Sequence, residues 1–262
     1  MDTYKRQEFG QNFLADRRLI AEVQRLVRTE TSGPIIELGA GDGALTRPLA
    51  RLGRPLTALE IDPRRARRLA TSVRADATAD AEVEIVCADI LRHRLPDTPH
   101  TVVGNLPFHL TTAVMRKLLA ADAWTCAVLI VQWEVARRRA GVGGASMLTA
   151  IWWPWYDFRL LRRIPAASFR PMPSVDAGLM TMHRRPVPLV TEQRGYQTFV
   201  KQVFQSPGRS LAEMILRTNR VRRTDLHAWL HRNRIPTRAL PKDLTPEHWA
   251  ELWTLVRSTL MS

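Results

Sequence analysis

The chain has 262 residues, of which 45% are hydrophobic, so it is long enough for one core of ordinary size and a smaller module. Its 39 Lys and Arg residues exceed its 25 Asp and Glu residues, which gives a formal net charge of +14. This excess favours a polyanionic partner such as nucleic acid, although a coding bias toward Arg would give the same balance. No segment approaches the roughly 18 apolar residues of a membrane span, and the N-terminus has no apolar signal core, so we expect a cytoplasmic protein without membrane contact.

The two cysteines, Cys87 and Cys126, each lie in or beside an apolar run. Buried, reduced thiols are therefore expected, rather than a disulfide or a metal site. We expect no metal ion. The sequence contains no heptad pattern that would form a dimer seam, which favours a monomer.

Short apolar runs of strand length alternate with amphipathic helical stretches from Ile35 onward. This alternation is typical of βαβ units and predicts a mostly parallel sheet. The expected strands are residues 35–38, 56–60, 83–87, 101–103 and 127–131.

The pattern changes after a helical piece at residues 145–152. Two β-like runs, 156–164 and 177–183, flank a Pro-rich stretch without a helical pattern, which indicates an antiparallel pair at one sheet edge. From about Thr191 the chain is predicted to be helical, with breaks at residues 206–208, near Thr224 and at residues 241–246. The sequence thus predicts an α/β domain over residues 1–184 and a small all-helical domain over residues 185–262.

A glycine-rich loop, Glu37 to Gly43, follows the first of these strands directly and opens a helix at about Ala44. Glycines in this position let the backbone approach a nucleotide-like ligand, although an ordinary tight turn uses similar residues. Glu60 ends the next strand, where a carboxylate can bind both hydroxyls of a ribose, or can simply be solvated.

Asp89 follows the third strand and is placed to accept a hydrogen bond from an adenine amino group, with Ile61 and Ile90 on either side of the ring. A helix cap or an Asx-turn would explain Asp89 equally well. Ligands of open α/β sheets bind beyond the carboxyl ends of the strands, so polar sites at three successive strand ends favour a bound nucleoside.

The fourth strand is followed by Asn105-Leu106-Pro107-Phe108, a sequence suited to methylating the exocyclic amine of adenine. That amine is a poor nucleophile, because its lone pair is delocalised into the ring. The Asn105 side-chain carbonyl and the Leu106 main-chain oxygen can accept its two hydrogens, while Pro107 stiffens the turn and Phe108 stacks on a flipped base. S-adenosylmethionine is the methyl donor that this arrangement implies, and direct displacement needs mainly alignment. His109 receives no role, since the reaction requires no tuned imidazole.

These motifs resemble those of the rRNA adenine-N6 methyltransferases, and most closely the erythromycin-resistance (Erm) type that acts on 23S rRNA. The resemblance covers the whole length and includes, besides the segments above, residues 11–14, 132–144, 152–155 and 169–176. It implies a Rossmann-like domain that binds S-adenosylmethionine, followed by a small helical domain that binds RNA. Phe108 departs from the family pattern, because many relatives have Tyr there, which removes a hydroxyl contact but keeps stacking.

The resemblance also implies roles for individual residues. Asn105, Leu106, Pro107 and Phe108 form the catalytic site around the target adenine. The cofactor is bound by Gln11, Asn12, Leu14, Gly39, Gly41, Glu60, Ile61, Asp89, Ile90 and Asn105. By the same resemblance, methylation of an adenine near the peptide exit tunnel blocks macrolide binding, and often lincosamide and streptogramin B binding.

Three other functions stay open at this point. The small-subunit (16S) rRNA adenine dimethyltransferases share most of these motifs, but their C-terminal regions look different. A DNA adenine methyltransferase differs by its substrate rather than by the motif. A non-catalytic nucleic-acid-binding factor can use the same fold, but it has no need for Glu60, Asp89 and Asn105 together.

Three further features have competing interpretations. Trp152, Trp153 and Trp155 are predicted to pack inside the fold rather than to stack on RNA. Residues 137–139 precede a glycine-rich loop and are candidates for phosphate contact, as is a string of C-terminal arginines. These are Arg209, Arg217, Arg220, Arg222 and Arg223, and a solvated basic surface would explain both groups as well.

Overall fold

The computed structural model describes residues 12–75 and 82–260 of the chain. Contacts divide the chain into two compact units, one of residues 1–136 and 159–183 and the other of residues 137–158 and 184–262. Residues 137–158 therefore group with the C-terminal helices. The predicted domain division after residue 184 stays a prediction.

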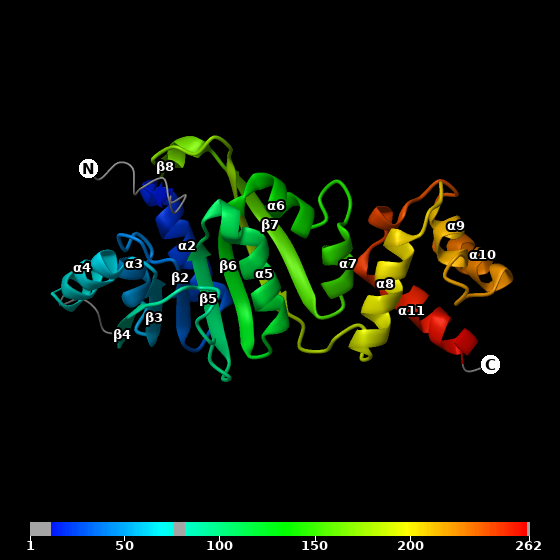
Figure 1. The fold of residues 1–262 in the computed structure, drawn as a ribbon, viewed down its shortest axis with the longest axis horizontal. Helices are drawn as coiled ribbons and strands as arrows, with labels where there is room; N and C mark the ends of the chain where they lie inside the picture. The colour runs from blue at the N-terminus through cyan, green and yellow to red at the C-terminus, as the bar shows by residue number, and fades with distance from the viewer. Residues whose placement is uncertain (1–11, 76–81, 261–262) are drawn as a thin grey trace. The chain divides into compact units, whose positions relative to one another are not determined.

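The first unit is built on a seven-stranded sheet in the order β4-β3-β2-β5-β6-β9-β7 (Figure 1). The five strands from β4 to β6 are parallel, and β9 pairs antiparallel with β6, which confirms the predicted mostly parallel sheet with an antiparallel edge. The strands are β2 (Ile35–Leu38), β3 (Leu56–Glu60), β4 (Val83–Cys87), β5 (His100–Asn105), β6 (Trp124–Gln132), β7 (Tyr156–Ile164) and β9 (Ala177–Arg184).

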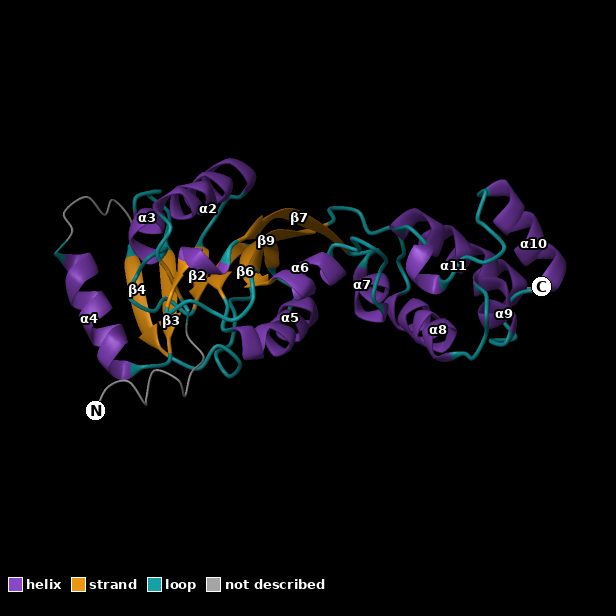
Figure 2. Ribbon diagram, turned by 90° about the horizontal axis from the view of Figure 1, so that it is seen from above, coloured by secondary structure: helices purple, strands orange, loops and turns teal. Residues whose placement is uncertain are grey.

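Helices cover both faces of this sheet, with α2 and α3 on one side of the strands and α5 on the other (Figure 2). The apolar side of α2 packs with α3 on the sheet, where Leu19, Val23, Leu49 and Ile35 are all buried. Asp16 caps α2 by accepting hydrogen bonds from the amides of its first turn. The helices and short 3-10 turns are α2 (Arg17–Glu30), α3 (Thr46–Ala50), α4 (Pro63–Arg74), η1 (Phe108–Leu110), α5 (Thr111–Ala120), α6 (Trp133–Arg139) and η2 (Ala166–Ser168).

A two-stranded antiparallel sheet, β1 (Phe13–Leu14) with β8 (Phe169–Arg170), ties the N-terminal segment to the segment that follows β7. Phe13 lies opposite Arg170 and Leu14 opposite Phe169. The side chains of Leu14 and Phe169 are buried in the same hydrophobic core as α2. This pairing positions Asn12 and Phe13 beside the carboxyl ends of the main sheet.

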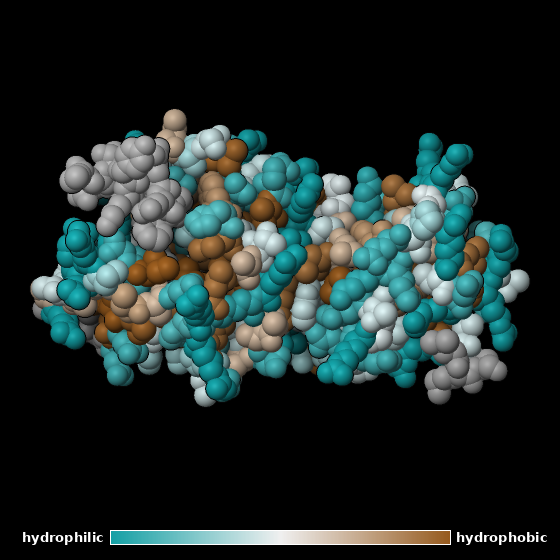
Figure 3. Space-filling view, viewed as in Figure 1, coloured by the Kyte–Doolittle hydropathy of each residue, from teal (hydrophilic) through white to brown (hydrophobic). Residues whose placement is uncertain are grey.

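The second unit contains α7 (Met147–Trp152), α8 (Gln193–Gln205), α9 (Leu211–Leu216), α10 (Arg223–Arg232), η3 (Pro241–Asp243) and α11 (Pro246–Leu260). The break after α8 agrees with the predicted one at residues 206–208. The next break, at residues 217–222, lies just before Thr224, and the last spans residues 233–245 with η3 inside it, so it begins earlier than predicted. Trp152, Trp155 and Tyr156 meet edge to face, and the Tyr196 hydroxyl donates a 2.8 Å hydrogen bond to the carbonyl of Ala150. The tryptophan segment therefore packs against other aromatic side chains, as predicted. On the face in Figure 3, hydrophilic side chains predominate over these helices.

The cysteine prediction is half wrong. Cys126 is buried in β6, and burial raises the pKa of its thiol to about 12. Cys87 is exposed instead, since it is the last residue of β4 and β4 forms the edge of the sheet. Both thiols are free.

Candidate active site

The carboxyl ends of β2, β3 and β5 lie next to one another, because Leu38 pairs with both Leu59 and Gly104 in a parallel register. Two cavities open beyond these ends, of about 280 Å³ and about 180 Å³. Gly39, Glu60 and Pro107 line both cavities. The larger is also lined by Asn12, Phe13, Leu14, Glu37, Ala40, Gly41, Asp42, Ala44, Leu45, Arg47, Asn105, Leu106 and Phe108; the smaller by Ile61, Asp89, Ile90, Leu91, His109 and Leu110.

The glycine-rich loop forms one wall of the larger cavity. Gly39, Gly41 and Gly43 have φ angles of +77°, +57° and +84°, a left-handed backbone that costs other residues energy. The amides of Gly39 and Ala40 both donate to the carbonyl of Leu59, at 3.0 and 2.9 Å, which anchors the loop to β3. The predicted helix begins two residues later than expected, at Thr46.

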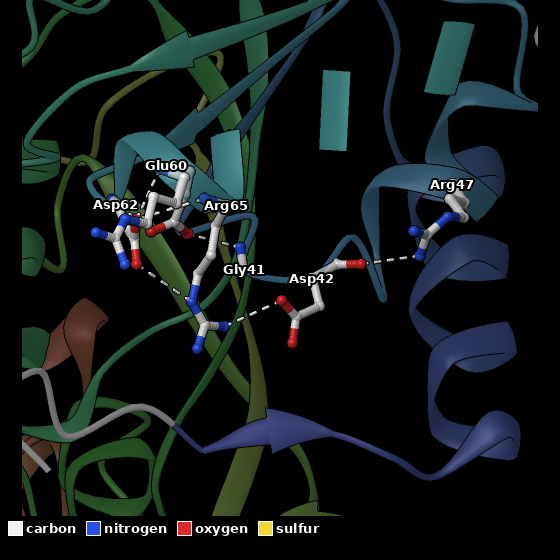
Figure 4. A network of polar contacts seen from close by, with 7 residues as sticks. Gly41, Asp42, Arg47, Glu60, Asp62 and Arg65 are labelled. Carbon is white, nitrogen blue, oxygen red and sulfur yellow. Dashed lines mark hydrogen bonds and ion pairs between the residues drawn. The ribbon is translucent and has the colours of Figure 1, made fainter. Parts of the chain in front are cut away.

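Glu60 is buried, with 1% of its surface exposed, at the point where the loop meets β3. Its Oε2 accepts a 2.7 Å hydrogen bond from the Gly41 amide, and its Oε1 accepts a 2.9 Å bond from the Asp62 amide (Figure 4). Each carboxylate oxygen has a second lone pair, so the side chain can still accept hydrogen bonds from a ligand. The two amides therefore hold the Glu60 carboxyl group in place at the wall shared by both cavities.

Asp89, Ile90 and Ile61 come together around the smaller cavity. Asp89 Oδ1 accepts a 2.8 Å bond from the Leu91 amide, so the Asx-turn considered from sequence is present. The turn and a site role are compatible, because Asp89 also lines the cavity. Ile90 is buried, whereas Ile61 is 44% exposed.

Lys117 of α5 hydrogen-bonds the main chain of the turn that follows Asp89. Its Nζ donates to the carbonyl oxygens of Ile90 at 2.7 Å and Leu91 at 3.1 Å, and also to that of His93. Desolvation lowers the pKa of Lys117, and the nearby Asp89 carboxylate opposes that shift. The sequence analysis did not find Lys117, because its partners lie more than twenty residues earlier in the chain.

Asn105 and the three residues after it line the larger cavity. The Asn105 amide nitrogen donates a 2.8 Å hydrogen bond to the main-chain oxygen of Asn12, which leaves the side-chain carbonyl as its other polar atom. The Leu106 amide donates to Ile130 at 3.0 Å, and the Leu110 amide to Pro107 at 2.9 Å. The turn after β5 is therefore fixed at both ends.

Phe13 closes the larger cavity on the side of the glycine loop. A Cβ at Gly41 would lie 3.0 Å from Cε1 of Phe13, so the ring lies directly on the loop backbone. The guanidinium of Arg65 covers the same ring, 4.4 Å from its centroid. Neither Phe13 nor Arg65 was assigned to the site from sequence.

Glu37, the first residue of the glycine motif, is a second buried carboxyl in this region, with 1% exposure. Burial raises its pKa to about 7; the neighbouring Thr46 hydroxyl counteracts this shift, and the Glu60 charge adds to it. Its Oε2 has no hydrogen-bond partner among the described residues.

Nearly all of the cofactor and catalytic residues named from sequence therefore line one or both cavities. Gln11 lies outside the described residues. Within residues 12–75 and 82–260, no three His, Cys, Asp or Glu side chains gather as a metal site would require. None of the helices in the described part of the chain has the length and apolar character of a membrane span.

The arginines at residues 137–139 lie in the second unit. Arg138 is exposed, whereas Arg139 is partly buried and donates a 2.9 Å hydrogen bond to the Ser146 hydroxyl. The glycines that follow adopt left-handed φ angles, and a Cβ at Gly141 would lie 2.8 Å from the Trp153 ring. Arg139 and Gly141 therefore shape this loop, and Arg138 is the candidate for RNA contact.

Comparisons with known proteins place this site in one family. The chain matches the model of the ribosomal RNA adenine dimethylase family over residues 3–257. It is 48% identical over 254 residues to the mycinamicin-resistance protein MyrB of Micromonospora griseorubida, covering 96% of this chain and 79% of that protein. It is 49% identical over 214 residues to an rRNA adenine N-6-methyltransferase of Corynebacterium diphtheriae, covering 81% and 82% respectively. Among solved structures, the 23S rRNA methyltransferase ErmE matches with a TM-score of 0.85 and 31% identity, covering 94% of this chain and 100% of that one.

Proposed function

Because the chain belongs to the ribosomal RNA adenine dimethylase family, in its erythromycin-resistance (Erm) branch, we propose that it methylates N6 of one adenine in 23S rRNA, with S-adenosylmethionine as donor. The observation that carries this proposal is the position of Glu60 and Asn105. They end β3 and β5, the two strands that flank β2 in the parallel part of the sheet, and Asn105 lines the larger of two cavities that Glu60 also lines. One cavity thus suits a nucleoside and the other a target amine.

The residues at these cavities fit S-adenosylmethionine. Asp89 and Ile90 would hold the adenine in the smaller cavity, with Ile61 on its outer side. Glu60 would accept hydrogen bonds from the ribose hydroxyls, because its two oxygens each keep a lone pair after bonding Gly41 and Asp62. When bound, the cofactor supplies an electrophilic methyl group.

The methionine end of the cofactor would lie against the glycine loop. The backbone at Gly39 and Gly41 leaves space there that a side chain would fill. Leu14 of β1 and Asn12, just before this strand, would close the cavity, and we assign the same function to Gln11 from the family resemblance.

The target adenine would enter the larger cavity beside Phe108, which stacks on its ring. The Asn105 side-chain carbonyl and the Leu106 main-chain oxygen accept the two N6 hydrogens, so that the lone pair turns out of the ring plane toward the methyl group. Pro107 keeps these two oxygens in a fixed relation, and the bond from Asn105 to Asn12 sets which atom of the amide faces the amine. The amine proton leaves to solvent, and proximity and alignment supply most of the acceleration.

Resistance to macrolides, and to lincosamides and streptogramin B, is the biological consequence that we propose, through an adenine near the peptide exit tunnel. The 48% identity to an antibiotic-resistance protein supports this function over 16S rRNA dimethylation. Since ribosomal RNA is the substrate, we also propose that the enzyme acts in the cytoplasm.

Labelled methyl transfer to protein-free 23S rRNA and, in parallel, to immature small subunits tests the proposal, with the modified adenine mapped. Transfer to the exit-tunnel adenine is expected. Transfer only to small subunits would make the protein a 16S enzyme, and transfer to neither would contradict catalysis on rRNA.

Two variants test the site. Asn105→Ala should abolish transfer and keep cofactor binding, because it removes an acceptor for the amine. Asp89→Ala should weaken cofactor binding. Full activity of both variants on 23S rRNA would show that the residue assignment is wrong.

A further inference from the structure

A third cavity, of about 390 Å³, lies beside the glycine loop next to α4. It is lined by Asp42, Arg47, Arg65, Arg68, Leu69 and Ser72, and we call it the arginine groove. Asp42 and Arg47 also line the larger active-site cavity, so the two spaces adjoin. The proposed function uses none of its three arginines.

Arg47 brings positive charge into the groove that no carboxylate in its hydrogen bonds offsets. Its guanidinium donates to the carbonyl oxygens of Asp42 at 2.9 Å and Gly43 at 3.3 Å, and to the Ser72 hydroxyl at 3.3 Å. All three partners are formally neutral. These bonds fix the orientation of the side chain but leave its charge available.

Arg65 approaches Asp42 from the other side (Figure 4). Its Nη1 lies 3.1 Å from Asp42 Oδ1, and its Nε lies 3.6 Å from Asp62 Oδ2. Arg65 is therefore the arginine of the groove whose charge is compensated. The groove contains three guanidinium groups against the single carboxylate of Asp42, so its lining has a net positive charge.

Arg68 lies three residues after Arg65 on α4, on the same side of the helix. It is exposed, and its guanidinium has no hydrogen bond or ion pair among the described residues. The Arg68 guanidinium has no partner in this part of the chain and lies beside the Arg47 guanidinium, whose orientation is fixed. Such a pair can bind a phosphate group, because the planar guanidinium of Arg can donate two hydrogen bonds to phosphate oxygens.

We propose that the arginine groove binds a phosphate of the RNA backbone near the target adenosine, chiefly through Arg68 and Arg47. This inference rests on the proposed function, because it takes the larger cavity as the site of the flipped adenine. A flipped nucleotide keeps its backbone outside the pocket that receives its base. Phosphate contacts fix the position of a nucleic acid on a protein, and a groove that shares Asp42 and Arg47 with that pocket can set the register of the RNA.

The competing interpretation is a solvated basic face of α4. Arg64 and Arg67 are also exposed, without a side-chain partner among the described residues, but they do not line the groove. This difference supplies a matched control: Arg68→Ala and Arg67→Ala remove the same charge, from adjacent positions of one helix. Only the first removes a groove residue.

The experiment measures four quantities for the wild type, R68A, R67A and R68K. These are the dissociation constant for a 23S rRNA fragment carrying the target adenine, at several salt concentrations; the cofactor dissociation constant by calorimetry; and kcat and KM for methyl transfer. Inorganic phosphate is titrated in parallel as a free-anion probe.

We expect R68A to weaken RNA binding roughly threefold to tenfold, as loss of a hydrogen bond of typical net strength does, and to reduce the slope of the logarithm of the binding constant against the logarithm of the salt concentration by about one. The KM for RNA should rise while kcat at saturating RNA and the cofactor constant stay unchanged. R67A should resemble the wild type, and R68K should recover part of the loss.

Equal effects of R68A and R67A would overturn the proposal in favour of a solvated helix face. Binding of inorganic phosphate that depends on Arg68, without any change in RNA affinity, would make the groove a small-anion site and also overturn it. If the wild type neither binds nor methylates the RNA fragment, the proposed function itself fails, and this proposal falls with it.

Discussion

The Gly41 amide donates a 2.7 Å hydrogen bond to Oε2 of Glu60, and this bond joins the glycine loop to the end of β3. The other carboxylate oxygen is bonded to the Asp62 amide at 2.9 Å. One buried side chain therefore accepts from two main-chain donors and, in the proposed function, also from the ribose. Shape of the loop and recognition of the ligand depend on the same two atoms.

Glu60→Gln should weaken cofactor binding and lower stability. An amide has only one acceptor oxygen, so its nitrogen would face one of the two N–H donors in a buried site, at a cost of about 1–3 kcal/mol. Calorimetry with S-adenosylmethionine and thermal unfolding measure the two effects. Glu84→Gln, on the exposed side of the neighbouring strand β4, is the control. If Glu60→Gln leaves both the cofactor dissociation constant and the midpoint of thermal unfolding unchanged, the hydrogen bonds from the Gly41 and Asp62 amides do not shape the site.

A pair of glycine substitutions separates backbone strain from steric conflict. Gly41 and Gly53 both have left-handed φ angles, +57° and +66°. A Cβ at Gly41 would lie 3.0 Å from the Phe13 ring, whereas nothing lies within 4 Å of a Cβ at Gly53. Gly53→Ala should cost about 1–2 kcal/mol of folding free energy from its backbone conformation alone and keep cofactor affinity. Gly41→Ala should cost more and should also weaken cofactor binding. If the two variants lose the same stability and the same cofactor affinity, the Phe13 ring does not form a wall of the cofactor site at Gly41.

The strands and the strand-end residues could be predicted because each depends on local sequence. Apolar runs bounded by Gly and polar residues set the strands, and a parallel sheet brings successive carboxyl ends to one edge. Glu60, Asp89 and Asn105 are therefore found near one another in the structure, as expected. The Pro-rich stretch between β7 and β9, which has no helical pattern, likewise predicted an antiparallel edge, and the antiparallel pairing of β9 with β6 confirms that edge.

What sequence could not predict depends on which elements become neighbours. Lys117 reads as an ordinary helix lysine until α5 is placed behind the turn at Ile90. Arg65 belongs to a basic run that suggests only a charged surface, yet it covers the Phe13 ring. Cys87 lies in an apolar strand, and its exposure follows from the position of β4 at the sheet edge. Strand order and tertiary contacts are long-range properties that no local pattern contains.

Lys117→Met should weaken cofactor binding and leave kcat at saturating cofactor unchanged. The methionine keeps the apolar stem but removes the ammonium that bonds the carbonyl oxygens of Ile90, Leu91 and His93. Without it, the turn that carries Asp89 loses its fixed geometry, and we expect roughly a tenfold rise in the cofactor dissociation constant, about 1.4 kcal/mol. Calorimetry and steady-state kinetics measure the two parameters.

Lys201→Met, on the exposed side of α8, is the control for loss of one positive charge. Lys117→Arg should restore part of the affinity, because the charge returns with a different shape. An unchanged cofactor constant in Lys117→Met would show that the turn is held by the Asp89 bond to Leu91 alone.

Glu37 should make the free energy of unfolding depend on pH between about 4.5 and about 7. Burial raises its pKa from an ordinary 4.5 to about 7, so in this interval the folded protein binds a proton that the unfolded chain has released. Stability contributed by the protonated group is complete below about pH 4.5 and is lost as the pH rises through about 7, a change of about 3 kcal/mol. Glu37→Gln cannot ionise, so its stability should decline less over this interval, and the difference should be greatest above pH 7. Urea unfolding at pH 5, 6, 7 and 8 measures this, with Glu84→Gln as a control that keeps the wild-type slope. Parallel pH profiles for the wild type and Glu37→Gln would mean that Glu37 stays ionised in the folded protein despite its burial.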